Sequence, residues 1–275
     1  MGRIRRTFER LRTIHERALI PYVTAGNPDI ETTKALVREM ARRGGDIIEI
    51  GVPFSDPLAD GPIVQRASQR ALQGGTTMRK ILHMVGELRS DVDAPLVLMT
   101  YYNPVFRYGE AAFVADALAA GVDGLIIPDL PPEEANTLID LTSETLLDLI
   151  FLVAPTSTPE RMASIAAASR GFIYYVSRLG TTGVRDRLSN DLRSMLAQLR
   201  SVTSKPIAVG FGVSTPEHVR LVAEMADGVV VASAILKLIE DLPDRSKVLE
   251  PVGDFVAELK AATRLTPIEA RPSAS

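Results

Sequence analysis

The sequence has no cysteine among its 275 residues. This absence excludes disulfides, thiolate zinc sites and cysteine nucleophiles together, and it fits a protein of the reducing cytoplasm. Histidine is also scarce, because His15, His83 and His218 lie far apart and none has a histidine neighbour at metal-ligand spacing. We therefore interpret the histidines as solvated or packed side chains, and we predict no metal site.

Long apolar runs are absent as well. No stretch approaches the roughly 18 apolar residues that a transmembrane helix needs, so we expect no membrane segment. The basic N-terminus differs from a transit peptide because it carries Glu9 and Glu16 and lacks an apolar core segment. We predict an amphipathic helix there, with Ile4, Phe8 and Leu11 on one face.

An excess of positive charge is also missing. The chain has 31 lysines and arginines against 34 acidic residues, for a net charge of −3. This balance argues against a nucleic-acid-binding surface, although small basic pockets for an anionic metabolite are still compatible with it. The hydrophobic fraction of 46% supports a sizeable core. The length suits a single α/β barrel, which typically has about 250 residues.

Short apolar segments alternate with helical patterns along the whole chain. Eight of them are predicted strands, at 18–24, in the first half of 46–62, and at 95–101, 124–129, 148–153, 171–177, 206–210 and 228–232. Their continuous apolar character indicates parallel strands covered on both faces. We predict a (β/α)8 TIM barrel over residues 1–265, as one domain, with extra helices at the N-terminus and after strand 2.

A doubly wound sheet is the alternative fold. It is disfavoured because no Gly-x-Gly-x-x-Gly motif follows the first strand. Between the strands we predict a turn at Asn103-Pro104, a helix start at 131–134, and helix caps at Thr158 and at 214–217. Residues 266–275 contain two prolines and no apolar stripe, so we predict a frayed C-terminal tail.

Two carboxylates stand out around the second strand. Glu49 lies inside the apolar run, where an unpaired charge is costly, and Asp60 lies 11 residues later in a loop rich in proline and aspartate. One enclosed carboxyl group and one in a polar loop can divide the roles of general acid and base. The alternative is that Glu49 is a core residue paired with an arginine, and that Asp56 and Asp60 are loop caps.

Other strand ends carry candidate residues, since barrel active sites form at the C-terminal ends of the strands. Tyr101, Asp129 and Tyr174 are such residues, although the tyrosines can be rim packing and Asp129 a turn residue. Glycine and serine follow strands 7 and 8, at 210–214 and 231–235, where barrels tend to bind phosphate at a helix N-terminus. The glycine-rich loop 179–183 has the composition of a segment that closes over a ligand.

Residues 53–62, Pro-Phe-Ser-Asp-Pro-Leu-Ala-Asp-Gly-Pro, closely resemble the signature of the tryptophan synthase α subunit family. Further segments match the family in order along essentially the whole chain, at 21–26, 49–56, 101–104, 127–131, 177–183 and 210–214. The resemblance implies a lyase that cleaves indole-3-glycerol phosphate by a retro-aldol reaction to indole and glyceraldehyde 3-phosphate. Tryptophan biosynthesis would then use the indole.

The resemblance also assigns roles to residues. Glu49 matches the family's general acid/base, and Asp60 matches the carboxylate that holds the indole N–H. The phosphate-binding positions correspond to Gly183, Gly212 and Ser233, with Ala232 where the family often has glycine. The pocket-lining positions correspond to Tyr22, Met99, Tyr101, Ile126, Asp129, Tyr174 and Phe211. Thr182 matches the loop threonine that closes towards Asp60, and Tyr22 replaces a common phenylalanine.

No cofactor is implied for this chain, because the family's pyridoxal phosphate belongs to a partner β subunit. The resemblance implies an α2β2 heterotetramer in which indole passes directly to that partner, with contacts from the loops after strands 2, 3 and 6, including Asp56 and the 101–108 region. Two alternatives are a stand-alone lyase that releases indole, and a barrel that mainly activates a β subunit because Ala232 weakens phosphate binding. Retention of Glu49 and Asp60 argues against the last one.

Overall fold

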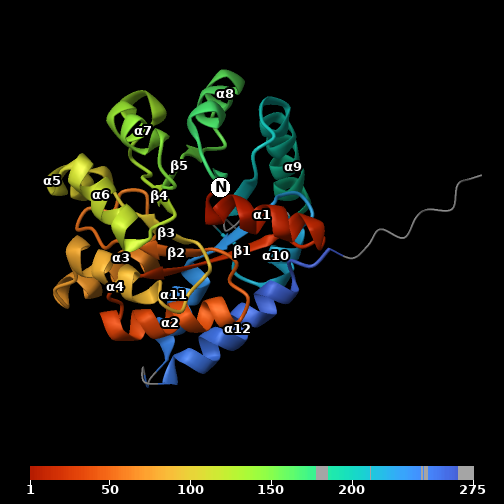
Figure 1. Cartoon of the computed structure of the whole chain (residues 1–275). Helices are drawn as coiled ribbons and strands as arrows, with labels where there is room; N and C mark the ends of the chain where they lie inside the picture. The colour runs from red at the N-terminus through yellow and green to blue at the C-terminus, as the bar shows by residue number, and fades with distance from the viewer. Residues whose placement is uncertain (178–184, 211, 243, 245–246, 266–275) are drawn as a thin grey trace, which may run out of the picture.

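The computed structural model describes residues 1–177, 185–210, 212–242, 244 and 247–265, with no account of the side chains of 185–190. Short parallel strands form one sheet at the centre, and helices surround it (Figure 1). The predicted C-terminal tail, residues 266–275, lies outside the described residues. No helix within the described part of the chain is long and apolar enough to cross a membrane.

The sheet is a barrel in which β1 lies between β2 and β9. The strand order is β5-β4-β3-β2-β1-β9-β8-β7-β6. The strands are β1 (Ala18–Thr24), β2 (Ile48–Gly51), β3 (Leu96–Met99), β4 (Gly124–Ile126), β5 (Asp148–Ile150), β6 (Leu152–Val153), β7 (Ile173–Val176), β8 (Ile207–Gly210) and β9 (Gly228–Val231). This arrangement confirms the predicted TIM barrel and excludes the doubly wound sheet.

One predicted strand is divided in the structure. Only Phe151 separates β5 from β6, and its backbone N–H donates to the Ser169 hydroxyl (3.3 Å) instead of a neighbouring strand. Strand β5 pairs with β4, and β6 pairs with β7, where the N–H of Tyr174 donates to the carbonyl of Phe151. The two pieces therefore act as the fifth of eight barrel strands, and they join the two halves of the sheet.

The helices follow the strands as the alternating pattern predicts. They are α1 (Arg3–Thr13), α2 (Ile30–Arg42), α3 (Pro62–Gln73), α4 (Met78–Leu88), α5 (Tyr102–Tyr108), α6 (Glu110–Ala120), α7 (Asn136–Ser143), α8 (Pro159–Ala168), α9 (Arg185–Val202), α10 (Pro216–Ala223), α11 (Ser233–Asp241) and α12 (Leu249–Ala261). The predicted caps are confirmed, because Thr158 accepts the N–H of Arg161 and Thr215 accepts that of His218. Helix α1 buries Ile4, Phe8 and Leu11, as predicted.

Two local predictions need correction. The predicted turn at Asn103-Pro104 is wrong, because both residues belong to α5. Proline fits there since it occupies the first turn, where its missing N–H would have had no partner within the helix. The predicted helix start at 131–134 is instead a short 3-10 helix, η1 (Pro132–Glu134), which precedes α7.

Aspartates tie the N-terminal ends of the strands together. Asp46, Asp123 and Asp227 each precede a strand, and their carboxylates accept the N–H of Leu19, Leu96 and Ile207 at 3.0, 2.9 and 2.8 Å. Each aspartate also pairs with a cation: Lys260 with Asp46, Arg3 and Arg89 with Asp123, and Arg200 with Asp227. Helix α1 covers this end of the barrel, where the rings of Phe8 and Phe172 lie 5.8 Å apart.

Candidate active site

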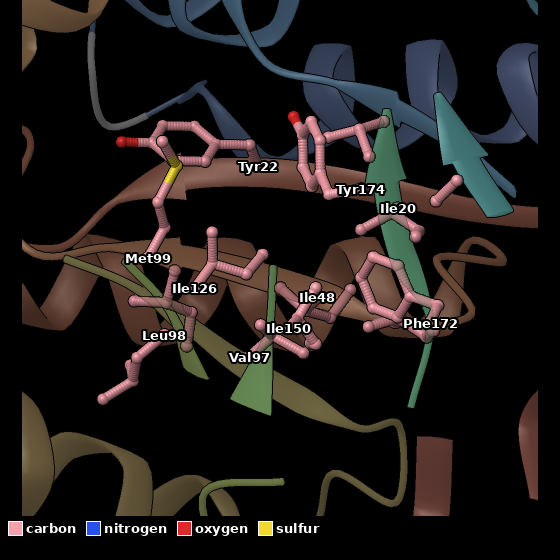
Figure 2. Packing of buried hydrophobic residues seen from close by; sticks show 14 of the residues in the cluster. Ile20, Tyr22, Ile48, Val97, Leu98, Met99, Ile126, Ile150, Phe172 and Tyr174 are labelled. Carbon is pink, nitrogen blue, oxygen red and sulfur yellow. The ribbon is translucent and has the colours of Figure 1, made fainter. Parts of the chain in front are cut away.

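The predicted site residues gather at the opposite, C-terminal end of the barrel. Tyr22 of β1 lies in register with Glu49 of β2, and Met99 of β3 lies in register with Ile126 of β4. Figure 2 shows Tyr22, Met99, Ile126 and Tyr174 among the buried side chains of the barrel interior. The short parallel strands thus bring residues together that lie more than a hundred positions apart in the sequence.

Glu49 is an unusual core residue. It is 1% exposed, and its Oε2 has no hydrogen-bond partner within the described residues. Burial in an apolar environment disfavours the ionised carboxylate, and the nearby charge of Asp60 disfavours it further, which together raise the pKa of Glu49 to about 8. The alternative role of a core residue paired with an arginine finds no support, since no arginine pairs with Glu49 in the described part of the chain.

Asp60 occupies a more polar position in the loop after β2. Burial raises its pKa to about 6, while a hydrogen bond from the Tyr101 hydroxyl opposes this rise. The same hydroxyl accepts the N–H of Ala59 at 3.0 Å, and the Tyr101 ring lies 5.2 Å from that of Phe54. Tyr101 therefore holds the loop after β2 at the barrel end and places a hydrogen-bond donor at the carboxylate of Asp60.

The hydroxyl groups of two buried tyrosines lie against strand ends that have no side chain. A Cβ on Gly51 would lie 1.8 Å from the Tyr22 hydroxyl oxygen, and one on Gly210 would lie 2.3 Å from that of Tyr174. Burial and the nearby carboxylates raise the pKa of both tyrosines. The sequence analysis missed the role of Gly51; the available signal was a glycine that ends a predicted strand.

Asp129 combines its predicted place at the rim with a structural contact. It is exposed, and its Oδ1 accepts the N–H of Tyr102 at 2.9 Å, at the start of α5. Burial and the charge of Asp60 raise the pKa of Tyr101, and the charge of Asp129 adds a smaller effect in the same direction. Asp129 therefore has a structural contact at the start of α5, which supports its interpretation as a turn residue, and its place in the pocket stays a prediction.

The predicted phosphate site lies at the N-terminus of α11. Ser233 is the first residue of this helix, and the residue before it, Ala232, has no side chain that could cap the first N–H groups. Gly212 has a φ of +77°, a conformation that favours glycine, whereas Ala232 has a φ of −113°, which suits any L-residue. The remaining predicted residues, Thr182, Gly183 and Phe211, lie outside the described residues.

This geometry can support proton transfer on a phosphorylated, largely apolar substrate. Two carboxyl groups with separated pKa values face one apolar interior, and such pairs divide acid and base roles. The N-terminus of α11 lies at the same barrel end, and a helix N-terminus can bind an anion through its N–H groups and dipole. The two features together fit a ligand with an apolar ring at one end and a phosphate at the other.

The comparisons with known proteins agree on one family. The family model for the tryptophan synthase alpha chain matches residues 8–264. A tryptophan synthase alpha chain of Citrifermentans bemidjiense is 50% identical over 260 residues, which cover 94% of this chain and 97% of the relative. That of a Synechocystis strain is 48% identical over 264 residues, covering 95% and 99%.

Solved structures agree with the sequence relatives. A ligand-free structure of Mycobacterium tuberculosis tryptophan synthase, with a point mutation in its alpha chain, has a chain that is 39% identical, with a TM-score of 0.87 and coverage of 96% of this chain and 100% of that one. The alpha subunit of Legionella pneumophila tryptophan synthase is 37% identical, with a TM-score of 0.88 and coverage of 96% and 98%.

Proposed function

The chain belongs to the tryptophan synthase alpha chain family, and from that premise we propose that Glu49 and Asp60 carry its reaction. The reaction is the lyase cleavage of indole-3-glycerol phosphate to indole and glyceraldehyde 3-phosphate, in the biosynthesis of tryptophan. The observation that supports this assignment is the buried carboxyl group of Glu49, whose Oε2 has no hydrogen-bond partner among the described residues, near a second carboxyl group of lower pKa. We infer one lyase domain over residues 1–265.

The raised pKa of Glu49 suits a proton carrier. At neutral pH its carboxyl group is mainly protonated, so it can donate a proton to C3 of the indole ring. The resulting carboxylate then accepts the proton of the glycerol hydroxyl next to the ring. The carbon–carbon bond breaks, its electrons return to the indole, and the hydroxyl carbon becomes the aldehyde. Glu49 ends the cycle protonated, as it began.

Asp60 has the complementary role in this proposal. It is mainly ionised at neutral pH, so it can accept the indole N–H and offset the positive charge of the protonated ring. The remaining predicted residues bind the substrate. We assign the pocket walls to Tyr22, Met99, Tyr101, Ile126, Asp129, Tyr174 and Phe211, the phosphate to Gly183, Gly212, Ala232 and Ser233, and loop closure towards Asp60 to Thr182.

We also propose that the chain works with a tryptophan synthase β subunit in a cytoplasmic α2β2 heterotetramer. The partner would hold pyridoxal phosphate and receive the indole. Two large apolar side chains support a partner surface beside the site, since Leu58 is 94% and Phe106 63% exposed. They lie on the segments after β2 and β3, where the sequence predicts contacts.

The first test is indole release by the purified chain, alone and with a β subunit, beside Glu49→Gln. We expect low activity alone, a large rise with the partner, and a loss of about 10²–10⁴-fold in the variant. Glu9→Gln, on the exposed face of α1, is the matched control and should retain full activity. Full activity without a partner would favour the stand-alone lyase, and no turnover in either condition would leave only the activator role.

A further inference from the structure

A charged cluster joins helix α3, helix α11 and the segment after β1. Arg66 of α3 contacts Glu240 of α11 with both prongs of its guanidinium, at 2.9 and 2.7 Å. Arg70, one turn later in α3, donates to the same carboxylate at 2.8 Å. Arg70 also donates to the side-chain oxygen of Asn27, which follows β1, at 3.1 Å. Glu240 thus holds two arginines, and the cluster fixes α3, α11 and the end of β1 against one another.

Each of the two joined helices begins at a different end of the proposed substrate site. Helix α3 starts at Pro62, two residues after Asp60, and Gln65 of α3 donates to the carbonyl of Asp60 at 2.8 Å. Helix α11 starts at Ser233, where we place the phosphate. Helices of this length are stiff, so a contact between them controls how far the indole end of the site lies from the phosphate end.

The composition of the cluster favours a geometric role over a stabilising one. The side-chain nitrogens Nδ2 of Asn27 and Nη2 of Arg70 are buried and have no hydrogen-bond partner within the described residues. Unsatisfied buried donors cost stability, and apolar side chains would pack two helices with less loss. A bidentate guanidinium–carboxylate contact gives a fixed orientation that apolar packing does not.

We propose that Arg66, Arg70 and Glu240 are positioning residues that set the separation between Asp60 and the phosphate-binding end of α11. The inference rests on the proposed function. Neither arginine touches the substrate in this account. They hold the indole-binding end and the phosphate-binding end of the site one substrate length apart. A ligand that contacts both ends then binds more tightly, because its second contact forms within the same complex.

The test compares three ligands in a Glu49→Gln background, which binds without cleaving. Indole-3-glycerol phosphate reaches both ends, whereas indole and inorganic phosphate each reach one. The chain has no tryptophan, so fluorescence excited at the red edge of the indole absorption, where the chain's six tyrosines contribute little, reports the ligand. Phosphate binding is measured by calorimetry. We expect Glu240→Gln to weaken indole-3-glycerol phosphate about tenfold and to change each single-end ligand by less than about twofold.

Two further variants control the result. Asp241→Asn removes a charge from the same helix turn, where Asp241 forms a salt bridge with the exposed Lys237 at 2.7 Å. Its charge also acts on Arg66, but no hydrogen bond joins the two among the described residues, so the variant should change none of the three affinities. Arg66→Lys keeps the charge but loses the two-pronged contact, and it should give a smaller loss than Glu240→Gln while remaining folded.

The outcomes separate this inference from the proposed function. If Glu240→Gln leaves the affinity for indole-3-glycerol phosphate unchanged, or if all three affinities fall together, the positioning role is wrong. If the parent protein binds indole and phosphate but not indole-3-glycerol phosphate, the proposed function fails and this inference fails with it. A selective loss for the ligand that spans both ends supports the inference.

Discussion

At the scale of single residues, Glu49 and Asp60 work because they are unequal. Both have raised pKa values, but Glu49 is enclosed by the barrel whereas Asp60 receives a hydrogen bond from Tyr101. Their charges also interact, since ionised Asp60 makes ionisation of Glu49 harder. A proton carrier and an ionised acceptor can therefore coexist in the same pocket near neutral pH.

The pH dependence of kcat/KM should report this pair. We expect the rate to rise as Asp60 ionises near pH 6 and to fall as Glu49 ionises near pH 8. Asp60→Asn should lower the rate, remove the acidic limb, and move the alkaline limb to lower pH because the charge that raises the pKa of Glu49 is gone. An alkaline limb that stays in place in this variant would contradict the coupling.

Stability should depend on Glu49 in the opposite sense to a salt-bridged carboxylate. Protonated Glu49 makes its full contribution to the free energy of unfolding below pH 4.5, the ordinary pKa of this group in the unfolded chain. That contribution is lost as the pH rises through the folded-state pKa of about 8. Glu49→Gln cannot ionise, so we expect it to match the parent near pH 4.5 and to exceed it by roughly a few kcal/mol at pH 9. Urea unfolding of both proteins at the two pH values measures this, and equal stability at pH 9 would refute it.

The unlike environments of these two carboxylates could be predicted from sequence because each lies in a distinctive context, whereas their roles stay a proposal. An acidic residue inside an apolar strand is rare, and the 53–62 motif identifies its family. The surroundings of the tyrosines could not be predicted. That Tyr22 lies over Gly51, and Tyr174 over Gly210, depends on contacts across the barrel that no local pattern reports.

At the scale of elements, the N-terminus of α11 is our proposed phosphate site. Ala232 precedes it with a negative φ, so its methyl group causes no backbone strain. We expect Ala232→Gly to change the affinity for inorganic phosphate by less than about twofold and to cost about 0.5–1 kcal/mol of stability through added backbone freedom. Calorimetry and thermal unfolding measure the two effects. A large gain in phosphate affinity would show instead that the methyl group crowds the site.

The three aspartates that precede strands (Asp46, Asp123 and Asp227, the strand-initiating aspartates) should contribute to stability and not to catalysis. Asp123 is buried, pairs with Arg3 and Arg89, and accepts the N–H of Leu96. Asp123→Ala leaves a partly buried Arg89 without its partner, so we expect a loss of about 3–5 kcal/mol in the free energy of unfolding. The kcat of the folded fraction should not change. Asp140→Ala, on the exposed face of α7, is the control, and a comparable loss there would rule out a specific role for Asp123.

Element boundaries could be predicted only where local chemistry decides them. The caps at Thr158 and Thr215 are local and were predicted correctly, and the alternation of strands and helices predicted the barrel. Helix α5 was missed because Asn-Pro normally indicates a turn, whereas here Asp129 from the next strand end caps the helix. The division at Phe151 depends on the hydroxyl of Ser169, 18 residues away.

At the scale of the whole molecule, the two ends of the barrel have different tasks. The N-terminal end holds the strand-initiating aspartates and α1, and the C-terminal end holds the proposed site. Exposed apolar residues occur at both ends, since Phe106 follows β3 and Leu146 precedes β5. Only the first lies beside the site, so only the first belongs to our proposed partner surface.

This contrast allows the partner surface to be tested separately from the chemistry. Phe106→Asp replaces an exposed apolar side chain with a charged one. We expect basal indole release to persist and activation by a β subunit to fall at least tenfold, which is the size of effect expected from the loss of one aromatic contact at an interface. Leu146→Asp makes the same change at the opposite end and should leave activation intact. If both variants are activated as strongly as the parent protein, the β subunit binds a surface that does not include Phe106. If both lose activation equally, the loss is a general effect of the added charge. Titration of each variant with the β subunit, with indole release as the signal, distinguishes these results.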